Sequence, residues 1–208
     1  MRATPFAAVC LAICASAAHA QAPPTPDVSK RIAVQLTWDQ KIPMRDGVKL
    51  SATIYRVPKQ PKPLPVILAM TPYIAEHVAK QGMYFAQHGY VFVAVDLRGR
   101  GNSDGVYVPG RVEAKDGYDT IEWLAKQPWC DGQVATWGGS WLGFTQWSIA
   151  KEFPPHLKAM APTASVYPGV DYPQPHGIFM SYVLQWLTYV NGRALNSGLF
   201  EAWNLWSN

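Results

Sequence analysis

Two short, uninterrupted apolar runs constrain the fold of this chain more than any other feature. Residues 64–70 are Leu-Pro-Val-Ile-Leu-Ala-Met, and residues 90–95 are Tyr-Val-Phe-Val-Ala-Val. A strand with one face in water alternates polar and apolar residues, whereas continuous runs of this kind are typical of strands buried on both faces of a parallel sheet. The sequence therefore predicts a parallel sheet with both of its faces covered.

Segments with helical spacing separate the predicted strands. We predict a helix at residues 76–88, which stops at Gly89, and a second at about 112–126, which stops at Pro128. An Asp-Gly hairpin signal at 46–47 joins the first two of the remaining β-like runs. Those runs are residues 31–38, 48–57, 133–137 and 158–162. The alternation predicts an α/β fold with a doubly wound, mostly parallel sheet.

The sequence Val-Ala-Thr-Trp-Gly-Gly-Ser-Trp-Leu-Gly at residues 134–143 predicts a nucleophile elbow, a tight strand-to-helix turn that exposes a reactive serine. A predicted strand precedes it and a plausible helix at 144–150 follows it, which is the setting that the turn requires. Gly138 and Gly143 supply the small neighbours that a strained serine backbone needs. Ser140 is therefore the candidate nucleophile. The alternative is a Gly-Gly-Ser turn with no chemistry.

Acyl transfer by a serine also needs hydrogen-bond donors for the oxyanion that forms on the substrate carbonyl. The backbone N–H of Trp141, at the start of the predicted helix, is one candidate. A second donor should come from the loop after the strand that ends at Met70, and this loop is Thr71-Pro72-Tyr73. Position alone leaves two roles open for Tyr73: a phenolic donor to the oxyanion, or a packing aromatic with its hydroxyl in water.

Five segments in order resemble the cocaine esterase, α-amino acid ester hydrolase and X-Pro dipeptidyl-peptidase family of serine hydrolases. The most specific is Asp-Leu-Arg-Gly-Arg-Gly-Asn-Ser-Asp-Gly at 96–105. The others are residues 44–50, 71–73 and 127–132 and the elbow itself. Together they cover about residues 35–165.

The resemblance implies an α/β-hydrolase core, a helical cap and a C-terminal jelly-roll domain. It implies an oxyanion hole made by Tyr73 and the Trp141 amide. We expect an acyl-enzyme on Ser140 and no cofactor. Implied substrates are small esters or amides, or short X-Pro peptides. The family usually has tyrosine after the nucleophile, so Trp141 is a departure. The backbone donor survives this change, but any role of the tyrosine side chain in shaping the acyl pocket is not carried over.

Other charged and reactive residues favour structural interpretations. We expect Asp96, Arg98 and Asp104 to pair with each other or with backbone groups and so hold their glycine-rich loop. Cys130 is expected to be a buried, inert thiol. Four acidic residues at three-residue steps predict a solvated helix face: Glu113, Asp116, Asp119 and Glu122. No metal site is predicted, because the histidines are dispersed.

A base and an orienting acid are missing from this pattern. In α/β-hydrolases the triad follows the order serine, acid, histidine. His156, His176, Asp171 and Glu201 are poorly placed to reach Ser140. We expect a core at residues 31–164 and the start of a cap at 165–208, with one apolar helical stretch at 179–190; the alternative for this stretch is a C-terminal helix of the same domain. We expect the triad Asp and His beyond residue 208. The alternatives are a non-catalytic α/β-hydrolase-like binding protein, an inactive fragment that lacks the triad Asp and His, and an interfacial lipase-type esterase.

Residues 1–20 have the composition of a secretory signal peptide, with Arg2 near the start, an apolar stretch, and a small-x-small ending at Ala18-His19-Ala20. We predict cleavage between Ala20 and Gln21, a Pro-rich linker at 21–30, and a periplasmic or secreted protein without a membrane span after cleavage. The net charge of +4 comes from scattered basic residues. This distribution does not favour nucleic acid as a partner.

Overall fold

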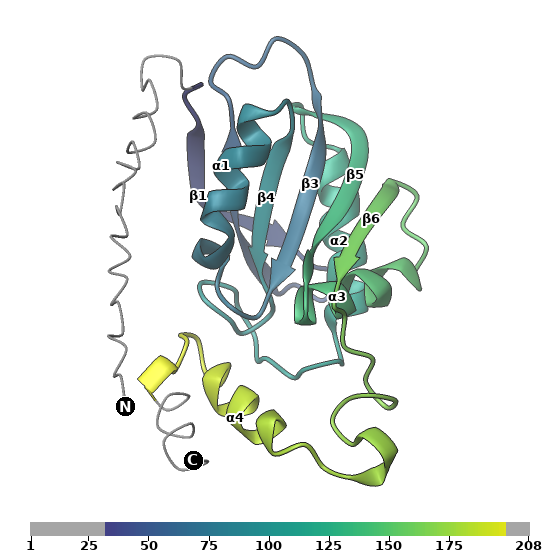
Figure 1. The fold of residues 1–208 in the computed structure, drawn as a ribbon. Coiled ribbons are helices and arrows are strands. Elements are labelled where there is room, and N and C mark those ends of the chain that lie inside the picture. The colour runs from purple at the N-terminus through teal and green to yellow at the C-terminus, as the bar shows by residue number, and fades with distance from the viewer. Residues whose placement is uncertain (1–31, 199–208) are drawn as a thin grey trace, which may run out of the picture. The chain divides into compact units, whose positions relative to one another are not determined.

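The computed structural model describes residues 32–198 (Figure 1). The predicted signal peptide, the predicted linker and Glu201 lie outside the described residues. The strands are β1 (Gln35–Pro43), β2 (Lys49–Arg56), β3 (Leu64–Thr71), β4 (Val91–Asp96), β5 (Cys130–Gly139) and β6 (Leu157–Thr163). The helices are α1 (Ala79–Gln87), α2 (Glu113–Ala125), α3 (Trp141–Ala150) and α4 (Ser181–Tyr189), with 3-10 turns η2 (Ala75–Val78) and η3 (Pro175–Gly177).

The strands form one sheet in the order β1-β2-β4-β3-β5-β6. β2 is antiparallel to both β1 and β4, whereas β4, β3, β5 and β6 pair in parallel. The two apolar runs are β3 and β4, neighbours at the centre, where Leu68 pairs with Val93. The predicted mostly parallel sheet is confirmed.

Successive side chains of the central strands fill two separate cores, one on each face of the sheet. Val66 and Leu68 of β3 pack in one core with Ile121 of α2 and Ile149 of α3. Ile67 lies in the other core, on the face that α1 covers (Figure 1). Burying an aliphatic side chain completely stabilises the folded state by roughly 1.5–3 kcal/mol. Because the central strands carry such side chains on both faces, helices must cover both faces of the sheet.

Two predicted elements have different boundaries in the structure. The helix expected at 76–88 is divided into η2 and α1, and no side chain caps either start. The strand expected at 31–38 begins later, at Gln35, and continues to Pro43. Its register against β2 shifts between Thr37 and Gln40, where Asp39 has a positive φ of 52°. This bulge brings the Asp39 carboxylate to 2.8 Å from the Ser51 hydroxyl, which donates to it.

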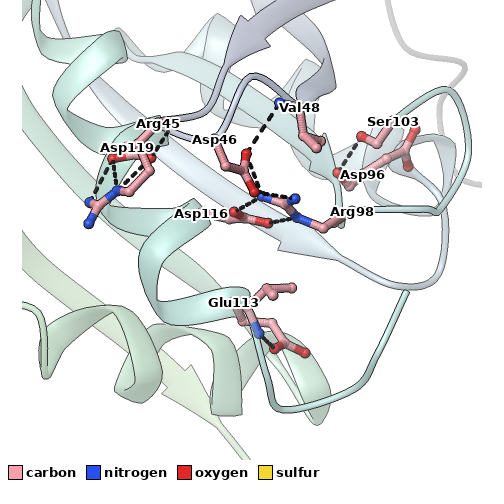
Figure 2. A network of polar contacts seen from close by, with 10 residues as sticks. Arg45, Asp46, Val48, Asp96, Arg98, Ser103, Glu113, Asp116 and Asp119 are labelled. Carbon is pink, nitrogen blue, oxygen red and sulfur yellow. Dashed lines mark hydrogen bonds and ion pairs between the residues drawn. The ribbon is translucent and has the colours of Figure 1, made fainter. Parts of the chain in front are cut away.

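The prediction of a solvated acidic face on α2 is wrong. Glu113 and Asp116 are buried, with 1% and 3% of their surface exposed. Each of the four acids contacts a specific partner, and Figure 2 shows those of Asp116 and Asp119. The partners are Trp141 for Glu113, Arg98 for Asp116, Arg45 for Asp119 and His156 for Glu122. The acids follow one another at three-residue steps along α2, and each is held by a partner from another part of the chain.

Arg98 joins two parts of the fold through paired carboxylates (Figure 2). Its guanidinium donates to Asp116 of α2 at 2.6 and 2.9 Å, and to Asp46 of the β1–β2 turn at 2.7 and 3.2 Å. Arg98 has a structural role, as expected, but the expected pairing with Asp96, Asp104 or backbone groups is wrong, because its partners are carboxylates outside the 96–105 loop. The hydrogen bonds to Asp116, and secondarily to Asp46, hold the pKa of Arg98 above its usual value.

Cys130, at the start of β5, is a buried thiol, as expected. Burial raises the pKa of the thiol above its usual value, so the reactive thiolate is disfavoured. Within residues 32–198, no helix has the length and apolar character needed to cross a membrane.

Candidate active site

Ser140 occupies the sharp turn between the end of β5 at Gly139 and the start of α3 at Trp141. Its backbone has φ 56° and ψ −123°, a conformation that a non-glycine residue adopts at a cost of roughly 1–3 kcal/mol. The surrounding structure must therefore enforce the turn. A hydrogen bond of 2.9 Å from the Ser140 N–H to the Thr163 carbonyl ties it to the end of β6. The serine side chain is left exposed.

Two glycines leave the space that this turn needs. A Cβ on Gly138 would lie 2.6 Å from the Leu142 Cβ, and Gly138 has a φ of +139°. A Cβ on Gly143 would lie 2.9 Å from the Ser165 Cβ. Both distances are shorter than packed carbon atoms allow, so the requirement for small residues at these positions is confirmed.

Gln146 of α3 holds the elbow in place through buried hydrogen bonds. Its side chain is 2% exposed, and its amide nitrogen donates to the Gly138 carbonyl at 2.9 Å. Its amide oxygen accepts from the Ala161 N–H at 3.0 Å and from the Thr136 hydroxyl at 3.1 Å. One buried amide therefore joins β5, α3 and β6 directly beneath the serine, in a setting where an unsatisfied polar atom would be costly.

The loop that carries Tyr73 is held at several points. The Tyr73 N–H donates to the Thr71 hydroxyl at 2.9 Å. The Pro72 carbonyl accepts from Arg100 Nε at 2.8 Å, and the Ala75 N–H donates to the Asp96 carboxylate at 2.8 Å. Asp96 and Arg100 both belong to the 96–105 segment. Their structural role is thus to position the neighbouring loop, in addition to holding their own.

The Asp96 carboxylate is buried, and this burial raises its pKa to about 6. Between pH 4 and pH 6 the folded protein retains a proton that the unfolded chain has released, so the contribution of Asp96 to stability falls as the pH rises. Two pKa units correspond to about 3 kcal/mol. The Asp96→Asn variant keeps an acceptor for Ala75 and does not ionise. We expect the free energy of unfolding of this variant, measured in urea, to rise relative to that of the wild type by up to about 3 kcal/mol as the pH increases from 4 to 7. A difference that does not vary with pH would contradict this assignment.

The Tyr73 hydroxyl lies 3.4 Å from Ser140 Oγ. It also accepts a hydrogen bond of 3.0 Å from the indole N–H of Trp186 on α4. Tyr73 itself is half-buried, and its ring centroid is 6.3 Å from that of Tyr189. The structure therefore brings together the phenol, the serine and the start of α3, from segments 67 residues apart in the sequence.

Arg100 connects the Tyr73 loop to the segment that follows α4. The side chain is fully buried, with 0% exposed. Besides Pro72, its guanidinium donates to the carbonyls of Gly192 and Ala194, the latter at 3.2 Å. All three acceptors are neutral backbone groups, so this buried charge is satisfied by carbonyl dipoles.

Arg193 makes the reverse connection. Its guanidinium donates to the carbonyls of Ser103 at 2.8 Å and Gly101 at 3.3 Å. Its own carbonyl accepts from the Gly101 N–H at 2.8 Å. Arg100 and Arg193 thus form a reciprocal clasp between the 96–105 segment and residues 192–194, which follow α4.

Comparison with known proteins identifies the family to which this chain belongs. The family model of the X-Pro dipeptidyl-peptidases (S15 family) matches residues 46–200, which include the Tyr73 loop, the elbow and α4. The chain belongs to the S15 family. Cocaine esterase from Rhodococcus sp. (strain MB1 Bresler) is 34% identical over 165 residues, which are 75% of this chain and 29% of that protein.

Solved structures agree with this membership. An α-amino acid ester hydrolase matches with a TM-score of 0.68 at 25% identity, over 89% of this chain and 34% of that chain. An aminopeptidase from a marine sediment archaeon, Thaumarchaeota archaeon, matches with a TM-score of 0.61 at 30% identity, over 75% of this chain and 30% of that chain. The fold is therefore that of the α/β-hydrolases. The chain spans about a third of the length of these relatives.

Trp141 departs from the tyrosine expected at this position in the S15 family. Its backbone N–H lies at the first position of α3, where helix N–H groups have no intrahelical acceptor. Its indole is 3% exposed and donates to the buried carboxylate of Glu113 at 3.3 Å. The ring stacks on Trp186 with centroids 4.5 Å apart. The larger side chain is thus accommodated inside the fold by an acid of α2 and a ring of α4.

Within the described residues, the structure places no histidine within hydrogen-bonding distance of Ser140 Oγ. His156 instead pairs with α2, where its Nδ1 lies 2.9 Å from Glu122 Oε2. His176 lies in η3 and Asp171 accepts from the Tyr167 N–H at 2.6 Å. Residues 32–198 contain no group of three or more His, Cys, Asp or Glu side chains arranged to hold a metal ion.

Sequence reasoning missed Trp186, Arg100 and Glu113 as parts of this site. Trp186 lies within the predicted helical stretch at 179–190. The abundance of tryptophan after position 120 was the one feature of the sequence that could have indicated a role for it in the site. Arg100 and Glu113 gave none, because their partners are backbone carbonyls and an indole from distant segments.

Proposed function

We propose that this protein is an S15-family serine hydrolase, in which Ser140 attacks the carbonyl of a small ester or amide, or of a short peptide, and forms an acyl-enzyme. The observation that carries the proposal is the 3.4 Å approach of the Tyr73 hydroxyl to Ser140 Oγ, on two loops that are anchored independently. The relatives support a hydrolase, since they are an esterase, an ester hydrolase and an aminopeptidase.

In the proposed chemistry, Ser140 is the nucleophile, and Trp141 and Tyr73 supply the oxyanion donors. Ser140 Oγ bonds to the carbonyl carbon while its proton passes to a base, and the carbonyl oxygen becomes an oxyanion. The Trp141 N–H and the Tyr73 hydroxyl donate to this oxyanion, where charge develops and preorganised donors have their largest effect. The leaving alcohol or amine then takes the proton, and water releases the acyl group by the reverse sequence.

We propose that the base and its orienting acid are a His and an Asp outside the described residues. The described histidines support this, because His156 is paired with Glu122 on α2 and none contacts Ser140. The same observation favours a second candidate, a binding protein that retains the elbow without hydrolysis. The presence of a histidine that reaches Ser140 in the full-length gene product distinguishes the two.

The test is covalent labelling with a fluorophosphonate, which reacts with a serine only when that serine is activated. We expect the full-length gene product to be labelled on the peptide that contains Ser140, as identified by mass spectrometry. A folded protein that hydrolyses esters while it is labelled elsewhere would overturn the proposal.

Export is part of the proposed function, and it rests on the sequence of residues 1–20. We expect the mature protein from its native host to begin at Gln21, as determined by N-terminal sequencing. Fractionation should then recover it from the periplasm or the medium. A protein from the same host that begins at Met1 or Arg2 would contradict export.

A further inference from the structure

We propose that Trp186 of the cap helix α4 is a positioning residue, whose indole N–H fixes the direction of the Tyr73 phenolic proton. This inference rests on the proposed function, since it concerns how Tyr73 acts as an oxyanion donor. The carrying observation is a chain of two contacts: Trp186 Nε1 to the Tyr73 oxygen at 3.0 Å, and the Tyr73 oxygen to Ser140 Oγ at 3.4 Å.

The direction of this chain follows from the chemistry of the two groups. An indole nitrogen can only donate, whereas a phenol has one proton and an oxygen that also accepts. The Tyr73 oxygen must therefore be the acceptor toward Trp186. Its single proton is directed away from the indole, and Ser140 Oγ lies within reach of it. Rotation of the phenolic O–H toward Trp186 would place two protons against each other.

The donor is held rigidly enough to impose this direction. Trp186 is 4% exposed and stacks on Trp141 with an interplanar angle of 29°. Tyr172 packs its edge against the same ring at 85° with centroids 5.9 Å apart. Residues 192–194, just beyond α4, are fastened by the reciprocal Arg100 and Arg193 clasp. The indole therefore has little freedom to follow a phenol that rotates.

Trp186 has a consequence for catalysis because hydrogen bonds in a chain polarise one another. Donation by the indole to the phenol oxygen makes the phenolic O–H a stronger donor to the oxyanion. It also means that this donor is already oriented before the substrate binds, so reorientation does not add to the activation barrier. Trp186 itself exchanges no proton and touches no reacting atom, and its whole effect passes through Tyr73.

Trp186→Phe should lower kcat for p-nitrophenyl acetate by about tenfold in the full-length gene product, with KM changed by less than about twofold. The decisive measurement is the double variant. If the indole acts through Tyr73, Trp186→Phe should cause no further loss in a Tyr73→Phe background. Trp147→Phe is the matched control, because Trp147 is 54% exposed on α3 and should retain full activity.

Loss of packing is separated from loss of the N–H by placing 3-benzothienylalanine at position 186, which keeps a bicyclic ring and has sulfur where the indole has N–H. We expect the same decrease of about tenfold in kcat. Full activity with this residue, or multiplicative losses in the double variant, would overturn the proposal.

A readout without catalysis keeps this inference distinct from the proposed function. In a ¹H–¹⁵N spectrum of tryptophan-labelled protein, the indole resonance that Trp186→Phe removes should move upfield in Tyr73→Phe. If it moves while Ser140 is neither labelled nor needed for hydrolysis, the contact stands and the proposed function fails. If it does not move in a protein that labels normally, the Trp186 inference alone fails.

Discussion

Replacing Ser140 with alanine should abolish ester hydrolysis and fluorophosphonate labelling in the full-length gene product. We expect kcat/KM for p-nitrophenyl acetate to fall by about 10⁴-fold or more, because the acyl-enzyme cannot form without the hydroxyl. The oxyanion donors at Trp141 and Tyr73 remain in this variant and would support only a small residual rate over water. The change removes one oxygen from an exposed side chain, so the fold should persist.

Ser148→Ala provides the matched control. Ser148 lies on α3, eight residues after Ser140, and the change likewise removes a single hydroxyl oxygen, here from a buried residue of the helix that follows the elbow. We expect it to keep its activity and labelling, and circular dichroism should show all three proteins folded. Full esterase activity in folded Ser140→Ala would place the nucleophile elsewhere and would leave the elbow as a structural turn.

The central sheet was predictable because its information is local. The runs that became β3 and β4 are apolar at nearly every position, and a strand buried on both faces leaves no alternative to helices above and below it. The elbow was predictable from its residue pattern: the requirement for Gly138 comes from Leu142, four residues further on, although that for Gly143 comes from Ser165, beyond β6. Spacing along the chain was enough in both cases.

The polar contacts were not predictable, because their partners are distant in the sequence. The spacing placed four acids at three-residue steps along α2, but it could not show that Arg45 reaches Asp119 across 74 residues. Trp186 and Tyr73 are 113 residues apart, and their contact depends on where α4 lies beyond the strands. An interpretation of charge runs as solvated faces therefore fails where a helix packs polar side chains between other elements.

Replacing Tyr73 with phenylalanine should lower kcat by about 10²-fold or more in the full-length gene product, since the loss of one oxyanion donor costs a few kcal/mol of transition-state stabilisation. The ring remains in its aromatic surroundings, so KM should change little. The hydroxyl is also the acceptor for the Trp186 N–H. Because Trp186 is only 4% exposed, its N–H would lose this partner in a buried position. We therefore expect a decrease of about 1–3 kcal/mol in the free energy of unfolding.

The two losses in Tyr73→Phe can be measured separately, because a donor that acts only in the transition state lowers kcat at any temperature at which the protein remains folded. Kinetics well below the unfolding transition isolate that loss, and urea unfolding gives the change in stability. Tyr84→Phe is the matched control, since Tyr84 is 56% exposed on α1, outside the site, and should show neither effect. A Tyr73→Phe variant with wild-type kcat and reduced stability would assign Tyr73 to packing, and the second oxyanion donor would then have to come from another group near Ser140.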